Sequence, residues 1–141
     1  MHGLKILKVL WAAPCSALGL MFAAVLLALG GSAALNHGAI EVTYRRSRAG
    51  CGSLALALPF RGIVFGHIIL AVTAEELATI GAHERVHVAQ YEHWGPLFFV
   101  AYGLSSVWQG VNGRNPYRCN YFEVQARERS AAASALRQIQ E

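Results

Sequence analysis

Residues 73–95 read TAEELATIGAHERVHVAQYEHWG, and the fold of the chain depends on this stretch. Thr73 followed by Glu76 is a capping-box pattern, which opens a helix. The helix is expected to run from residue 74 to residue 92 or 94. The glycine that closes the stretch and the proline after it end this helix and start another.

His83 and His87 are four residues apart in this helix, so their rings project from one face about 6 Å apart along the axis. That spacing allows both imidazoles to bind one metal ion. Zinc is the expected ion, because a catalytic zinc site takes three protein ligands and keeps one position for water. Glu84, beside His83, then has the position of a general base for that water, as in the His-Glu-x-x-His signature.

Two observations support a different interpretation of the motif. In a chain with six histidines and eight acidic residues, the pattern arises by chance at roughly the one-in-a-hundred level. On an exposed helix, Glu84 and His87 would form a solvated pair. Arg85 also stands where helices of this kind usually carry an uncharged residue.

The third ligand must come from another element. Glu76 lies about 10 Å up the helix from His83, and Glu92 is rotated away from the histidine face. Glu123 lies on a later helix that the intervening loop allows to fold back. Glu123 is also three residues after Asn120, so it can serve as the capping-box glutamate of that helix. Both roles remain open, with the ligand preferred.

The remaining pattern gives an α+β fold. Residues 39–44 are predicted as a short strand, and residues 50–53 as a turn. Residues 63–72 are predicted as a strand or as a tight strand pair interrupted at Gly66. A helix of residues 97–108 is apolar almost all round, too short to cross a membrane, and so is buried or lies at a membrane interface. A last helix, capped by Asn120, runs to about residue 139.

The N-terminal region contains the apolar segment that most strongly indicates attachment to a membrane. Residues 9–35 carry no charge, and about 20 apolar residues suffice to cross a bilayer. Residues 1–36 are therefore expected to form a transmembrane anchor, and residues 37–141 one compact domain. The alternative is a cleaved signal peptide, with Lys5 and Lys8 as its basic region and small residues before the cleavage point. The charges on the two sides leave the orientation undetermined.

Composition excludes several classes of function. The chain is 55% hydrophobic and only 14% charged, whereas about 25% charged residues is usual for a soluble domain. Its net charge of +4 is scattered, without the clustered basic residues of a nucleic-acid binder, and is better suited to membrane lipid. There is no aspartate, so a Ser-His-Asp triad or an aspartic dyad is excluded. Cys51 and Cys119 can form a disulfide only in an oxidising compartment.

Other histidines and tyrosines are also candidate site residues. His93 is about 120° from the ligand face and is interpreted as a surface or rim histidine, and His67 as a core or rim histidine. Peptide hydrolysis needs a group that stabilises the oxyanion. Four residues are chemically able to do so, and the sequence does not choose among them: Tyr91, Tyr117, Tyr121 and His93.

The motif residues, Gln90 and the Glu-x-x-Ala sequence that begins at Glu123 resemble the gluzincin branch of zinc metallopeptidases. The stretch 60–127 also resembles a group of small bacterial membrane proteins with the core HERVHVxQYExWGPL, here residues 83–97. The resemblance implies a zincin-like minimal domain with zinc on His83, His87 and Glu123 and with catalytic Glu84. It also implies a peptide or protein substrate, which would pair with the strand at residues 63–71 by β-augmentation.

The resemblance further implies a bacterial inner-membrane protein, and the one apolar segment predicts a single pass, whereas the oligomeric state stays open. One position departs from the pattern. Membrane-bound gluzincins usually carry Asp after Glu-x-x-Ala, and its carboxylate orients a zinc-bound histidine, but here the residue is Arg127. Glu128 is a possible substitute. The alternative function is a non-catalytic membrane protein, structural or metal-binding, that retains the motif helix.

Overall fold

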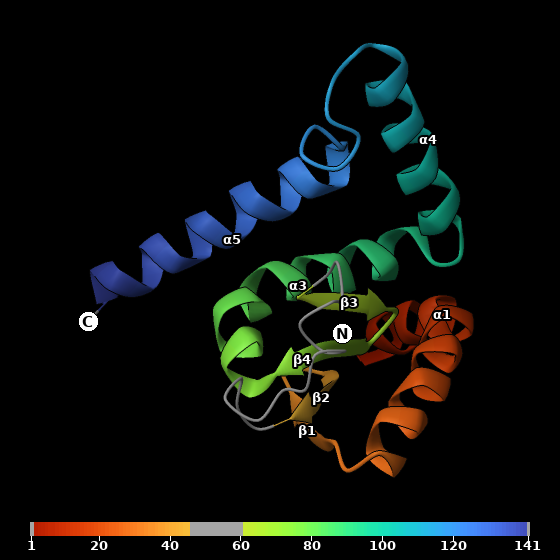
Figure 1. Cartoon of the computed structure of the whole chain (residues 1–141), viewed down its shortest axis with the longest axis vertical. Helices are drawn as coiled ribbons and strands as arrows, with labels where there is room; N and C mark the ends of the chain where they lie inside the picture. Colours follow the sequence, from red (N-terminus) through yellow and green to blue (C-terminus); the bar gives the residue numbers. More distant parts are fainter. Residues whose placement is uncertain (1, 46–60, 141) are drawn as a thin grey trace.

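The computed structural model describes residues 2–45 and 61–140 and has an α+β fold, as predicted (Figure 1). The turn predicted at residues 50–53 and the thiol of Cys51 lie outside the described residues. The described elements are, in chain order, α1 (His2–Ala28), β1 (Ser32–Asn36), β2 (Ala39–Arg45), β3 (Gly62–Phe65), β4 (Ile68–Thr73), α3 (Ala74–Trp94), α4 (Leu97–Val111) and α5 (Tyr121–Gln140).

The strands form one mixed sheet in the order β1-β2-β4-β3. β1 and β2 are antiparallel, β2 and β4 are parallel, and β4 and β3 are antiparallel. The first hairpin turns at His37 and Gly38, whose φ values of 51° and 81° suit a type I′ turn. The second turns at Gly66 and His67, so the prediction of a strand pair interrupted at Gly66 is confirmed.

The apolar N-terminal run does not form one helix to residue 35. α1 ends at Ala28, and Gly30, with a φ of 91°, turns the chain into β1. Residues 32–36, assigned from the sequence to the anchor, therefore form the exposed edge strand of the sheet. Hydropathy cannot separate the end of an apolar helix from a short apolar strand. By length and composition, α1 is nevertheless able to cross a membrane.

Small residues on one face of α1 pack against the sheet and α3. Ala12, Cys15 and Ala23 are buried there, and a Cβ on Gly19 would lie 2.7 Å from the Cβ of Ile68. The opposite face of α1 carries large apolar side chains that are exposed. α1 is thus built into the fold along one side and is uncovered along the other.

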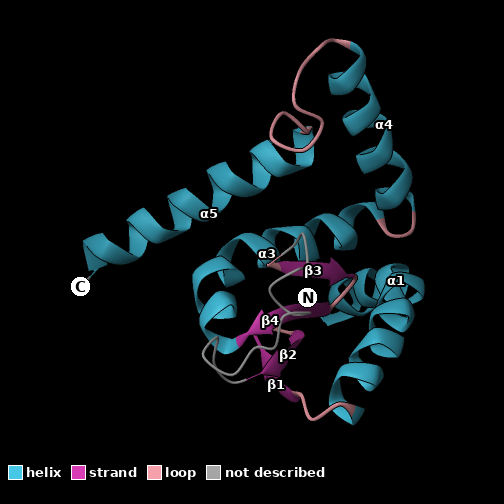
Figure 2. Ribbon diagram, in the orientation of Figure 1, coloured by secondary structure: helices cyan, strands magenta, loops and turns pink. Residues whose placement is uncertain are grey.

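The helices after the sheet form a zigzag. Figure 2 shows α3 crossing over the sheet, α4 running away from it, and α5 returning so that its first turns lie near α3. An aromatic core joins the three helices, with Phe98 of α4 in contact with Tyr91 of α3 and Phe122 of α5 at centroid distances of 4.4 and 5.1 Å. This packing brings the start of α5 over the middle of α3.

Candidate metal centre

α3 presents the two histidines from a rigid helix. Thr73 is fully buried and caps α3, since its Oγ1 accepts a hydrogen bond from the N–H of Glu76 at 3.1 Å. At the other end, Gly95 donates its N–H to the carbonyl of Tyr91, which closes the helix. His83 and His87 lie inside these limits, on the face turned towards α5.

The side chain of Glu123 meets both histidines. The two imidazole Nε2 atoms are 3.1 Å apart. Glu123 Oε2 is 3.3 Å from Nε2 of His83, and Glu123 Oε1 is 3.4 Å from Nε2 of His87. Ligand atoms about 2.05 Å from a tetrahedral zinc ion are about 3.3 Å from one another. The three donor atoms therefore have the spacing of three ligands around one metal ion.

The environment of Glu123 also suits a metal ligand. Its carboxylate is buried, and among the described residues Oε2 has no hydrogen-bond donor with suitable geometry. Burial alone would raise the pKa of Glu123, but the close approach of the His83 and His87 imidazoles outweighs it and holds the pKa well below its usual range. A buried anion with an unpartnered oxygen beside two imidazole nitrogens fits a divalent cation.

Glu123 does not act as a capping-box residue. The N–H of Asn120 donates to the carbonyl of Tyr117, not to a glutamate side chain. Asn120 itself caps α5, because its Oδ1 accepts from the N–H of Phe122 at 2.9 Å. The carboxylate of Glu123 is thus free for the histidines, and of the two roles left open by the sequence the structure supports the metal-ligand one.

A second layer of hydrogen bonds orients the ligands. Nδ1 of His87 lies 2.8 Å from Oε1 of Gln90, and Gln90 donates its amide to the carbonyl of Phe122 and to Gln125. These bonds fix the Gln90 oxygen towards His87, so the His87 proton sits on Nδ1 and Nε2 keeps a lone pair for metal. Tyr102 donates its hydroxyl to Oε1 of Glu123 at 2.9 Å. Tyr102 is a site residue that the sequence pattern did not predict.

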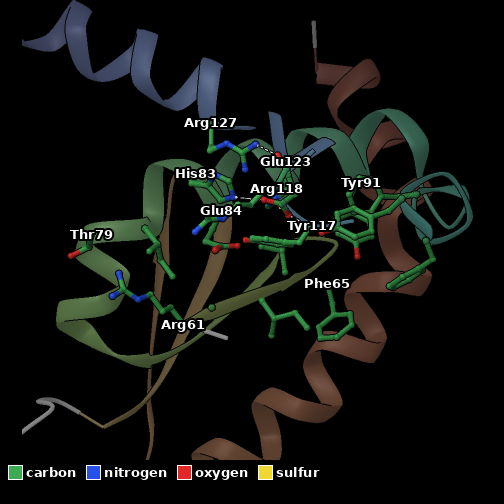
Figure 3. A pocket seen from close by; sticks show the side chains of 18 residues that line it. Arg61, Phe65, Thr79, His83, Glu84, Tyr91, Tyr117, Arg118, Glu123 and Arg127 are labelled. Atoms are coloured by element: carbon green, nitrogen blue, oxygen red, sulfur yellow. Dashed lines mark hydrogen bonds and ion pairs between the residues drawn. The ribbon is translucent and has the colours of Figure 1, made fainter. Parts of the chain in front are cut away.

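Glu84 is buried, and Figure 3 shows its side chain close to His83. Burial raises the pKa of Glu84, with an opposing contribution from the histidines. The neighbouring β3 backbone comes close: a Cβ on Gly62 would lie 3.2 Å from Oε1 of Glu84 and 2.6 Å from Cδ1 of Ile80. Glycine at position 62 thus leaves room for the carboxylate.

The side chains of His83, His87 and Glu123 line a cleft of about 1040 Å³ that runs along β3. β4 pairs with β2 on one edge and with β3 on the other, so it has no free edge for a substrate. Only the β3 part of the predicted pairing strand, Gly62–Phe65, is an edge strand among the described residues. The β-augmentation prediction is wrong for residues 68–71 for this reason, and it remains open for β3.

A row of aromatic rings connects the cleft with the outer face of α1. Phe22 of α1 stacks on Phe65 of β3 at 5.4 Å, and Phe65 lies 6.2 Å from Phe99 of α4. Phe99 in turn contacts Tyr91, 5.6 Å away. Phe65, Phe99 and Tyr91 line the cleft. One end of the cleft is therefore apolar and continuous with the exposed side of α1.

Of the four oxyanion candidates, Tyr117 and Tyr91 line the cleft (Figure 3). Tyr91 is buried in the aromatic core, whereas Tyr117 projects towards the donor set. Burial and the nearby Glu123 raise the pKa of Tyr117 to about 12. Tyr121 and His93 are exposed and are not among the described residues that line the cleft.

His67 and Arg85 both point away from the metal centre. His67 forms an ion pair with Glu92 at 3.3 Å, which agrees with its interpretation as a core or rim histidine. Arg85 forms an ion pair with the buried Glu41 of β2 at 2.9 Å. Asn36 also donates to Glu41, so this carboxylate is doubly bound. Arg85 therefore belongs to the sheet side of α3 and does not obstruct the ligand face.

Neither Arg127 nor Glu128 orients a histidine of the site. Arg127 is exposed and donates to the carbonyl of Arg118. Glu128 is also exposed, and Gln90 instead accepts the hydrogen bond that orients His87.

No match was found for this chain among protein-family models, curated proteins or solved structures.

Proposed function

We propose that this protein is a membrane-attached zinc-dependent peptidase of zincin-like fold. The observation that carries the proposal is the set of three donor atoms on His83, His87 and Glu123, spaced as ligands of one ion, with the buried carboxylate of Glu84 beside them. Two imidazoles and one carboxylate are the ligand set of a class of catalytic zinc sites in peptidases. The gluzincin resemblance of the sequence supports the same conclusion.

Each residue has a defined task in this proposal. His83, His87 and Glu123 hold the ion, and Gln90 keeps the proton of His87 on Nδ1. When bound, zinc lowers the pKa of water and polarises a carbonyl oxygen. Glu84 accepts the proton of the attacking water on its carboxylate and delivers it to the leaving amine. Tyr117 is the candidate donor to the oxyanion, because its hydroxyl stays protonated and its side chain projects into the cleft.

The substrate would be an extended peptide segment. β3 offers an edge along the cleft for main-chain hydrogen bonds, and the wall formed by Phe65, Phe99 and Tyr91 would accept an apolar side chain. α1 would attach the protein to a membrane, which the family resemblance places in the bacterial inner membrane. A single crossing is the geometry that the sequence alone indicates.

A non-catalytic metal-binding protein is the alternative, and the missing aspartate at position 127 is the observation in its favour. The two functions differ in turnover, not in metal binding. The purified chain is expected to bind about one zinc ion, and Glu123→Ala should weaken binding far more than Glu128→Ala, since Glu128 is exposed. Equal affinity in both variants would exclude Glu123 as a ligand.

Glu84→Gln tests the catalytic step. Glutamine keeps the size of the side chain but cannot accept the proton, so zinc content and folding should be unchanged. Hydrolysis of unstructured peptides with apolar side chains should fall by roughly 10²-fold or more. Zinc binding without hydrolysis by the parent chain would favour the non-catalytic alternative. Parental activity in Glu84→Gln would exclude the proposed mechanism.

A further inference from the structure

α1 contacts the domain from Lys8 to Leu26. Near its start, Lys8 lies 3.6 Å from Glu92, and the Trp11 indole occupies the space in which a side chain on Gly95 would stand. In the middle, Oγ of Ser16 accepts the N–H of His67 at 3.0 Å. Near its end, Leu26 packs on the sheet. Residues 8 to 26 of a helix cover about 27 Å, close to the thickness of a bilayer core.

A crossing by α1 would therefore carry the sheet into the membrane. The β3–β4 turn, held at Ser16, would lie near the middle of the bilayer. The linked polar side chains of Lys8, Glu92 and His67 run beside the same helix, and all three residues are partly exposed. Open sheet edges and exposed irregular backbone do not occur in the lipid core, because their polar groups cannot be satisfied there. Crossing is thus incompatible with the packing of α1.

The outward face of α1 is nevertheless far too apolar to face water. Residues 3–11 are exposed all round and the later turns are exposed on one side, with large apolar side chains from Leu4 to Leu27 that are 42% to 66% exposed. Lys5 and Lys8 are exposed near its start, where they can meet lipid headgroups. Because the packing of α1 against the domain excludes crossing, this apolar surface can reach lipid only if α1 lies along the bilayer surface.

α4 has a second apolar face of the same kind. Phe98 faces the core, whereas a stripe at intervals of three and four residues is exposed, which places it on one side of the helix. The stripe consists of Leu97, Val100, Leu104, Val107, Trp108 and Val111. With 15 residues, α4 spans about 22 Å and is too short to cross. Figure 1 shows α1 and α4 along the side of the molecule opposite the free end of α5.

We propose that the protein is monotopic: α1 lies in the plane of the membrane with its large apolar face in the lipid, and the α4 stripe is a second lipid contact. The occupant of both faces is the bilayer. Trp11, Trp94 and Trp108 are all exposed, and tryptophan is favoured at the boundary between headgroups and acyl chains. The sidedness of the chain does not depend on peptidase activity and is tested separately from it.

Labelling of single cysteines distinguishes lying from crossing. In a chain with Cys15→Ala, Cys51→Ser and Cys119→Ser, the variants Gly3→Cys and Ala33→Cys place thiols beyond the two ends of the apolar segment of α1. Arg129→Cys on the exposed side of α5 marks the side of the domain. A membrane-impermeant maleimide applied to intact and lysed spheroplasts should label all three from the same side. Labelling of Gly3→Cys and Ala33→Cys from opposite sides, or recovery of the chain in the soluble fraction, would overturn the proposal.

Tryptophan fluorescence tests the α4 contact. With Trp11→Phe and Trp94→Phe, Trp108 is the only indole, and lipids brominated close to the headgroup should quench it severalfold more than aqueous acrylamide does. The control moves the reporter to α5, with Trp108→Phe and Leu136→Trp, where acrylamide should quench and brominated lipid should not. Equal behaviour of the two reporters would exclude α4 from the membrane contact.

Discussion

Gln90 contacts the proposed metal ligand His87 but is not itself a ligand. It accepts the Nδ1 proton of His87 and is itself held by bonds to α5, so it links the motif helix with the helix that carries Glu123. Gln90→Leu removes the acceptor and should lower zinc affinity about 10- to 100-fold, measured by competition with a chelator. Gln125→Leu removes only one partner of Gln90 and serves as the control, with an expected change of less than about threefold. Equal losses in both variants would mean that packing, not orientation of His87, sets the affinity.

Gly62 is predicted to set the position of the general base. Gly62→Ala places a methyl group 2.6 Å from Cδ1 of Ile80 and 3.2 Å from Oε1 of Glu84, so both side chains must shift, whereas neither is a proposed metal ligand. We expect kcat to fall about 10-fold, since small misplacements of a catalytic group are costly, while zinc content stays at the parental level. Gly103→Ala is the control, because a Cβ there meets nothing within 4 Å. Loss of zinc in Gly62→Ala would contradict this assignment.

At the scale of single residues, the sequence predicts which side chains share one face of a helix, because the spacing along the helix determines this. The interval between His83 and His87 predicts their shared face, and the structure brings Glu123, the preferred third ligand of the sequence analysis, within 3.4 Å of both. The sequence does not predict the site roles of Tyr102 and Gly62, because their contacts depend on how α4 and β3 approach α3. A hydroxyl four residues after the buried Phe98, on the same helix face, is the signal that indicates an inward-facing Tyr102.

Asn120 joins two elements and thereby positions Glu123. Its side chain is fully buried, donates to the carbonyl of Tyr102 and to Oγ of Ser106, and accepts from the first turn of α5. Asn120→Ala should lower the free energy of unfolding in detergent by about 2 to 4 kcal/mol, from the lost cap and the unsatisfied carbonyl. Asn112→Ala, at the exposed end of α4, should change it by less than about 1 kcal/mol. A difference of under about 0.5 kcal/mol between the two variants would contradict this role.

At the scale of elements, the sequence predicts the bounds of a helix or strand where cap or turn residues mark them, and it does not where such residues are absent. The capping box and the Gly-Pro pair predict α3, and the structure gives Ala74–Trp94. α4 runs beyond the predicted residue 108 to Val111 because nothing in its sequence stops it before Asn112 and Gly113. β1 was missed because its partner, β2, determines its conformation, whereas its own composition continues that of α1.

For the whole molecule, the packing of α1 predicts that the rest of the chain does not fold stably without this helix. Residues 32–141 lose the helix whose buried Ala12 and Cys15 belong to the same core cluster as Val64 and Tyr91. We expect this fragment to aggregate or to lack the cooperative thermal unfolding transition of the full chain, because its uncovered sheet face is apolar. Size-exclusion chromatography and calorimetry are the measurements. A monomeric fragment that binds one zinc ion would instead support cleavage of α1 as a signal peptide.

The aromatic row from Phe22 to Tyr91 has a kinetic consequence if α1 lies in the lipid. A peptide dissolved in the same leaflet would reach the cleft by lateral diffusion along this row, and its density per unit of membrane area would set the encounter rate. Turnover would then show surface dilution. Adding substrate-free lipid that mixes with the substrate-bearing membrane would slow the reaction, although the bulk concentrations of protein and peptide were held constant.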